Sequence, residues 1–366
     1  MLPNYSILHK QDIFITEKYE PDIRRDELSF LSRSFERHFN ERPYLHHTCY
    51  LFLTKTTKER SRQQSNWNTL CRGFLVPKEI RDKETVERFM EAVGQFESIV
   101  NDSGLVRLER LTTEEITGTE NEPGIIERYL TLSADGTTML QDMQLNPDGM
   151  RIGDKRLCLH TLSDLDDLPG KVKTDGRYER LSTDRSDCRL SYAAPVGVML
   201  PCDHIYNQWI FIDDSNENLS RFEKAAKNMQ SLSRYSRSNQ INKEWLDEYL
   251  NEAHSNGLQS VRCHCNIIAW AENGHELRRV KNDVGSALAL MECTPHHNTT
   301  DLPALYWAGI PGNEADFPAE ETFYTFTGQA LCFFTAETCY RNSLSPFGIR
   351  MVDRLTGKPV FLDIDR

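Results

Sequence analysis

The chain has 366 residues, of which 39% are hydrophobic and 27% are charged, a composition typical of a globular protein with two or three packed units. No apolar run approaches the roughly 20 residues that a membrane-spanning helix needs. The 55 acidic and 43 basic residues give a net charge of -12, which argues against a nucleic-acid-binding surface. Ten cysteines without short regular spacing fit a reducing cytoplasm better than a disulfide framework.

Residues 1–111 predict an alternation of strands and helices. The apolar residues of one segment recur at helical spacing on one face, which predicts a helix over 85–100. The order β-α-β-β-α-β is that of a ferredoxin-like fold with an antiparallel sheet. We therefore predict a ferredoxin-like α+β subdomain over 1–111. Its strands are expected at 5–15, 47–54, 70–76 and 105–108, and its helices at 22–39 and 85–100.

The pattern weakens over residues 112–189. A short helix is expected at 125–132 and an extended segment at 157–162. The stretch 163–186 is rich in Asp, Gly and Arg and has few apolar residues, which indicates a long surface excursion. Such loops are uncommon unless they are functional or flexible. A solvated loop is favoured here over a partner-binding arm.

The alternation resumes over residues 190–343, which predicts a second α+β subdomain of similar order. No sequence repeat relates it to the first subdomain. Its strands are expected at 190–200, 204–212 and 260–270, and its helices at 213–234, around Trp245 as far as His254, at 276–291 and at 328–340.

Residues 344–366 predict a strand hairpin. Thr356, Gly357, Lys358 and Pro359 supply the turn between two apolar segments of strand character. The strand pattern continues to Arg366. We therefore expect the hairpin to lead into a further domain that this sequence does not include.

One group of residues has the chemistry of a metal site. Cys263 and Cys265 alternate along a predicted strand and share a face, whereas His264 points away from that face. Together with Cys293 and His296 they would give zinc a tetrahedral set of thiolates and imidazole. The spacing is looser than that of a zinc finger, and buried strand cysteines with a surface histidine are the favoured interpretation.

Motifs for catalysis are not found. The two Gly-Lys pairs, at 170–171 and 357–358, are followed by Val and Pro, so neither belongs to a phosphate-binding GxxxxGK[ST] loop. His275 and Glu276 begin an HExxH pattern, but Arg279 occupies the position of its second histidine. We expect no catalytic residue and no ATP hydrolysis from this chain.

Two other groups have competing interpretations. His46 and His47 are neighbours in a predicted strand, so they should face opposite sides and share no ligand. Basic residues concentrate at 55–62 and around Tyr235, and such patches hold single-stranded DNA in some proteins. The net acidity favours a solvated surface instead.

Six sequence blocks resemble the N-terminal region of TraG-type ATPases of Bacteroidetes conjugative transposons, which are similar to the VirB-type ATPases of type IV secretion. The resemblance extends from about Tyr5 to Asp365. The blocks are FLSRSFERHFNERP, LCLHTLSDLDDLPG, YERLSTDRSDC, SLSRYSRSNQINKEWLDEYLNEAH, LYWAGIPGNEADFPAEE and PFGIRMVDRLTGKP.

This resemblance implies an assembly and docking domain that takes part in DNA transfer by conjugation. Its implied partners are its own C-terminal ATPase domain, inner-membrane channel subunits and further copies of itself, and its implied location is the cytoplasm, peripheral to the inner membrane. It implies ATP and magnesium only for the motor domain, and no cofactor in this region. The alternatives are a zinc-dependent enzyme based on Cys263, Cys265, Cys293 and His296, or a single-stranded-DNA-binding module.

Overall fold

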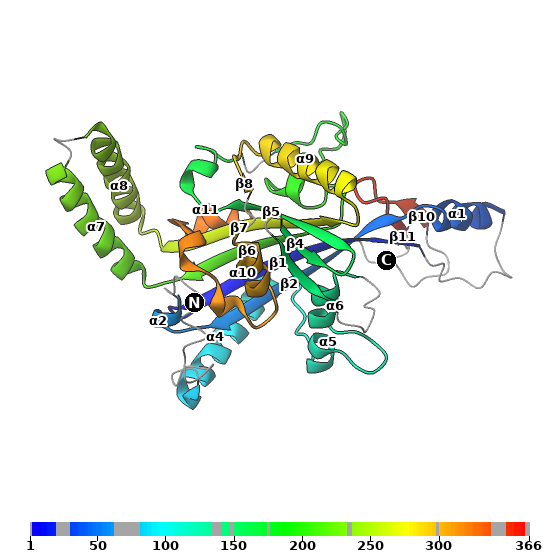
Figure 1. Cartoon of the computed structure of the whole chain (residues 1–366), viewed down its shortest axis with the longest axis horizontal. Coiled ribbons are helices and arrows are strands. Elements are labelled where there is room, and N and C mark those ends of the chain that lie inside the picture. The colour runs from blue at the N-terminus through cyan, green and yellow to red at the C-terminus, as the bar shows by residue number, and fades with distance from the viewer. Residues whose placement is uncertain are drawn as a thin grey trace.

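One antiparallel sheet organises the chain, and the α+β class is confirmed. The computed structural model describes residues 2–19, 30–61, 81–133, 141–146, 149–173, 176–232, 236–297, 300–337 and 349–362. Within these residues the sheet has nine strands in the order β2-β1-β6-β7-β5-β4-β3, with β8 paired to β5 and β9 paired to β7 (Figure 1). A separate two-stranded sheet consists of β10 and β11.

The strands differ in length, and the four that form the middle of the sheet pair over most of their residues. Their bounds are β1 (Ser6–Glu17), β2 (Tyr44–Lys55), β3 (Met143–Asn146), β4 (Gly149–Ile152), β5 (Lys155–Leu162), β6 (His204–Ile212), β7 (Ser260–Ala271), β8 (His296–His297), β9 (Phe323–Phe326), β10 (Ile349–Val352) and β11 (Pro359–Leu362).

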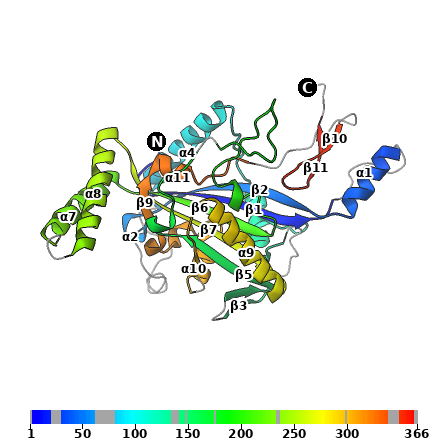
Figure 2. The same cartoon turned by 90° about the horizontal axis from the view of Figure 1, so that it is seen from above.

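The helices cover the sheet and extend beyond it. Helices α7 and α8 form a pair that projects at one end of the sheet, and α1 lies at the opposite end near β10 and β11 (Figures 1 and 2). The bounds are α1 (Phe30–Asn40), α2 (Lys58–Ser61), α4 (Lys83–Asp102), α5 (Thr113–Thr117), α6 (Ile125–Thr131), α7 (Ser215–Leu232), α8 (Arg237–Asn256), α9 (Gly274–Leu290), α10 (Leu302–Ala308) and α11 (Thr327–Leu331). No described helix is both long and apolar enough to cross a membrane.

Each face of the sheet has its own core. Side chains alternate along a strand, so Lys10, Asp12 and Phe14 of β1 lie on one face and His9 and Gln11 on the other. The first face packs against α9 and the turn 194–196. The second face packs against α6 and α10. Because both faces are covered, β7 is buried almost throughout and contains few exposed polar residues.

The predicted ferredoxin-like order is not confirmed. Strand β1 pairs with β2 on one side and with β6 on the other, so strands expected in two subdomains lie in one continuous sheet. The predicted strand 105–108 is wrong, since Leu105 is 89% exposed. The side chain of Asn101 accepts from the backbone N–H of Leu108 at 2.6 Å and so occupies a group that a strand would offer to a partner. The predicted strand 70–76 lies outside the described residues.

Two predictions in the second half also need correction. The apolar segment 190–200 is not a strand: it forms a 3₁₀ turn, Ala194–Val196, in which Pro195 has no N–H for a ladder. Its apolar character reflects burial beneath α9. The helix expected at 328–340 begins as α11 but ends at Leu331; residues 332–337 are not helical, and 338–340 lie outside the described residues. Elsewhere β6 has the predicted bounds, and α4, α7, α8 and α9 agree with the predicted helices within a few residues.

Candidate functional site

The four residues considered as zinc ligands do not form one close ligand group within the described part of the chain. Cys263 and Cys265 lie on one face of β7, as their alternation predicts, and Cys293 is buried in the same core. Burial raises the pKa of the Cys265 and Cys293 thiols. The three cysteines contribute to packing against α9.

His296 lies away from these thiols on the short strand β8. Its Nε2 is 2.9 Å from Oδ1 of Asp167 and 3.8 Å from Oδ2 of Asp164. Among the described residues these three form the group with the closest spacing of metal-type ligands, all within 4.8 Å of one another. The other oxygen of Asp167 accepts from the backbone N–H groups of Ser163 and Asp164, so its carboxylate stabilises a local turn.

Three of the basic residues considered for single-stranded DNA pair with acids. Lys58 pairs with Glu217 at 2.8 Å, and the Arg60 guanidinium with Asp316. Lys243 pairs with Asp247 one helical turn away on α8 at 2.9 Å. Phosphate binding would have to compete with these acids. Arg62, Arg234 and Tyr235 lie outside the described residues.

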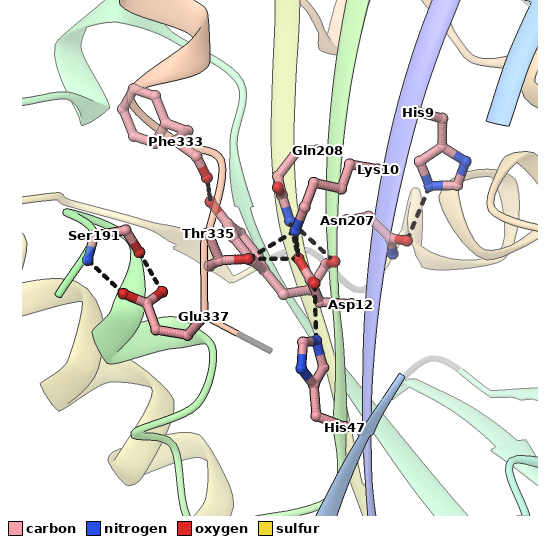
Figure 3. A network of polar contacts seen from close by, with 11 residues as sticks. His9, Lys10, Asp12, His47, Ser191, Asn207, Gln208, Phe333, Thr335 and Glu337 are labelled. Carbon is pink, nitrogen blue, oxygen red and sulfur yellow. Dashed lines mark hydrogen bonds and ion pairs between the residues drawn. The ribbon is translucent and has the colours of Figure 1, made fainter. Parts of the chain in front are cut away.

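A polar cluster centred on Asp12 lies within the sheet (Figure 3). Oδ1 of Asp12 is 2.9 Å from Nε2 of His47 on β2. Oδ2 accepts from the side-chain amide of Gln208 on β6 at 3.0 Å and from the Thr335 hydroxyl at 2.8 Å. Lys10 forms an ion pair with Asp12 and donates to the Thr335 hydroxyl at 2.7 Å. Three strands and the segment after α11 therefore meet at one carboxylate.

The carboxylate of Asp12 is charged although it is fully buried. Burial alone would raise its pKa, but the positive charge of Lys10 and the hydrogen bonds from His47 and Gln208 outweigh burial and hold the pKa well below the ordinary 3.8. Its side chain has 0% exposed area, so a substrate cannot reach it. Removing one partner of such a pair leaves an uncompensated buried charge. We therefore interpret the cluster as an internal joint rather than a catalytic centre.

An aromatic stack lies beside the cluster and shares His47 with it. The Phe14 ring lies between the imidazoles of His47 and His204, at 4.3 and 4.5 Å between ring centres and 8° between planes in both cases. Burial lowers the pKa of His204 to about 4. A ring nitrogen, Nδ1, is 2.7 Å from the carbonyl of Cys202, which accepts its hydrogen. His204 is therefore neutral at pH 7 and packs as an aromatic residue.

The segment 333–337 is fastened across the same face of the sheet (Figure 3). The buried Tyr206 hydroxyl donates to the carbonyl of Phe333 at 2.9 Å. Thr335 binds Asp12, and the carboxylate of Glu337 accepts from both the backbone N–H and the hydroxyl of Ser191. These bonds attach the segment that follows α11 to the centre of the fold.

The β10–β11 hairpin binds at the end of the sheet that carries α1. The backbone N–H of Leu45 donates to the carbonyl of Thr356 in the hairpin turn at 3.1 Å. The guanidinium of Arg350 lies over the rings of Phe35 on α1 and Phe361 on β11, at 5.4 and 5.5 Å from their centres. Gly357 has φ of 74°, a conformation that favours glycine in this turn. The hairpin thus contacts both α1 and β2.

His46 and His47 face opposite sides of the sheet, as predicted, with His47 at Asp12 and His46 at Glu17. The Asp12 cluster itself was missed by sequence reasoning. Its signal was the polar run His9 to Asp12 between apolar residues of a strand, which indicates buried polar partners when both faces are covered.

The fold and these contacts define an α+β protein with one large antiparallel sheet, a buried charged joint and a hairpin bound at one end. A comparison with models of known protein families finds no match, and neither does a search of curated proteins.

Proposed function

We propose that this chain is the N-terminal assembly and docking domain of a TraG-type conjugative-transfer ATPase. The six sequence blocks quoted above support the family, and the contacts of the β10–β11 hairpin carry the mechanical part of the proposal. The domain would dock the motor onto inner-membrane channel subunits at the cytoplasmic side of the membrane and contribute to contacts between copies. Nucleotide chemistry would belong to the motor domain.

The hairpin would transmit movement from the motor into the sheet. Thr356 in its turn is bonded to Leu45 near the beginning of β2. Two residues further along β2, His47 contacts Asp12, which binds Thr335. A displacement of the hairpin would therefore act first on β2 and α1 and then on the buried joint. Rigid, packed elements of this kind pass on displacements because close-packed interiors deform little.

This proposal is tested in the full-length protein in donor cells. Residues 356–358 would be replaced by a longer, flexible Gly-Ser turn, and both DNA transfer frequency and ATP binding would be measured. We expect transfer to fall at least tenfold while ATP binding changes little. The control lengthens the β4–β5 turn at Gly153 and Asp154, where the Asp154 side chain is 94% exposed. Equal losses of transfer and ATP binding would contradict the transmission role.

A second experiment tests whether ATP hydrolysis belongs to the motor domain alone. ATP hydrolysis by this chain would be compared with that of a version extended past Arg366 into the adjoining coding sequence. We expect activity only in the extended version. Binding of this chain to purified channel subunits would support the docking role. ATP hydrolysis by the chain alone would overturn the proposal.

A further inference from the structure

A pocket lies between α6 and the second face of the sheet, opposite the Asp12 cluster. Its lining comes from β1, β2, β6, β7 and α6 and includes both apolar and polar side chains. The apolar ones include Ile13, Ile205, Leu132 and Trp270, and the polar ones include Glu17, His46 and Arg128.

The polar part of the lining contains one carboxylate, Glu17, and one guanidinium, Arg128. The carboxylate of Glu17 is already engaged, since it accepts from the Tyr44 hydroxyl at 2.9 Å and lies 3.4 Å from Nδ1 of His46. The exposed guanidinium of Arg128 has no side-chain hydrogen bond or ion pair to any described residue. Lys358 of the hairpin turn adds a second positive charge, close enough to lower the pKa of His46 along with burial.

Two acidic residues of α5 and α6 form hydrogen bonds within their own helix ends. Oε2 of Glu115 accepts from the backbone N–H and hydroxyl of Thr112, and Oε2 of Glu127 accepts from the backbone N–H of Gly124. Neither forms an ion pair with Arg128. A guanidinium can bind a ligand carboxylate through two parallel hydrogen bonds.

Inside the pocket, Trp270 offers a hydrogen-bond donor that the protein does not use. Its side chain is buried, with 4% of the residue exposed, and its indole N–H has no acceptor among the described residues. Buried donors are nearly always satisfied in folded proteins. A water molecule held beside the ligand would complete this group.

The size of the enclosed space selects the apolar part of the ligand. The pocket measures about 60 Å³. An engineered cavity that takes a benzene ring measures roughly 150 Å³. A short branched aliphatic group therefore fits better than an aromatic ring.

We propose that this pocket binds a short-chain aliphatic carboxylate, with its carboxylate at Arg128 and its branched alkyl group against Ile13, Ile205 and Leu132. The inference does not depend on the docking function proposed above, because binding of a small ligand at Arg128 requires neither a motor domain nor a channel subunit. Either one can fail without affecting the other.

The probe for this site is isovalerate, and its neutral control is isovaleramide, which has the same alkyl group. The protein has five tryptophans, so its ¹H–¹⁵N spectrum contains few indole signals, and Trp270→Phe identifies the signal of Trp270. We expect isovalerate to shift that signal in a saturable way at millimolar concentration. Isovaleramide should bind at least tenfold more weakly.

The matched variants are Arg128→Gln and Arg88→Gln, the latter on α4, where Arg88 lies 3.7 Å from Glu84. We expect Arg128→Gln to weaken isovalerate binding at least tenfold, Arg128→Lys to weaken it less, and Arg88→Gln to leave it unchanged. The indole signals also report whether each variant is folded. The proposal is overturned if the Trp270 signal does not saturate, if acid and amide bind equally, or if Arg128→Gln binds as well as the wild type.

Discussion

Thr335 donates its hydroxyl hydrogen to Oδ2 of Asp12 over 2.8 Å, and this bond joins positions 323 residues apart. The same hydroxyl accepts from the ammonium of Lys10 at 2.7 Å. A single small side chain thus completes the hydrogen bonding of a buried ion pair and attaches the segment 333–337 to the central strand β1. Both roles can be tested separately from function.

Thr335→Val keeps the shape of the side chain and removes its hydroxyl. We expect the free energy of unfolding to fall by about 1–3 kcal/mol, because the carboxylate and ammonium each lose a partner in the interior. Backbone amides of 333–337 should exchange their hydrogens faster. Urea unfolding and hydrogen exchange measure these effects. Thr117→Val is the control, since Thr117 is exposed and bonds only within its own helix; an equal effect there would contradict this account.

Asp12→Asn should be most destabilising near neutral pH. The folded pKa of Asp12 lies below 3.8, so its charge contributes stability above pH 4, and this contribution is lost as the pH falls toward the folded value. Leaving Lys10 unpaired should cost about 3–5 kcal/mol at pH 7. Unfolding would be measured at pH 7, 5 and 3. The difference in the free energy of unfolding between wild type and variant should narrow below pH 4. A gap independent of pH would be evidence against a charged Asp12, and exposed Asp154→Asn provides the comparison.

His204→Phe should make the stability less dependent on pH. The folded pKa is about 4 and the ordinary value 6.5, so the unfolded chain binds a proton more readily and wild-type stability falls as the pH drops from 6.5 toward 4. The full loss in the free energy of unfolding is about 3 kcal/mol, calculated from the free energy that one unit of pKa shift represents. The variant keeps a ring beside Phe14 and lacks this loss. Burial lowers the pKa of His264 to about 3, so this residue contributes the same pH dependence of stability to the wild type and to the variant.

His254→Gln is the control for that experiment, because His254 is largely exposed. Denaturation of both variants and the wild type would be followed from pH 7 to pH 4. Parallel curves for the wild type and His204→Phe would contradict a buried neutral imidazole.

Purified protein should contain less than ~0.2 zinc per chain, since the cysteines pack in the core and His296 is turned toward Asp167. Elemental analysis after purification without chelators measures this directly. Stoichiometric zinc that is lost in Cys265→Ser would restore the metal site as a candidate.

Local patterns predicted the elements well where they were long. Strand β6 and helices α7 to α9 were found because apolar periodicity over many residues is a local property. Strand pairing is not local. The ferredoxin-like order was inferred by pairing strands within the first subdomain, whereas β1 takes β6 as its second neighbour. The segment 105–108 resembled a strand by composition. In the structure the side chain of Asn101, near the end of α4, accepts from the backbone N–H of Leu108.

The site was harder to predict for a related reason. Cys263, Cys265, Cys293 and His296 were selected by residue type, and only the structure shows that the cysteines face a core and the histidine an acidic turn. Thr335 could not be connected with Asp12 from the sequence, since nothing in either segment specifies the other. The charged run in β1 was visible, but its partners come from distant elements.

The arrangement of β1 also has a consequence for how the chain is made. Strand β1 leaves the ribosome about two hundred residues before its partner β6, and Thr335 follows later still. Until those segments emerge, Asp12 lacks Gln208 and Thr335 as hydrogen-bond partners. Folds dominated by such distant contacts form slowly. We therefore expect the nascent chain to need protection by chaperones until β6 and the segment 333–337 have been synthesised.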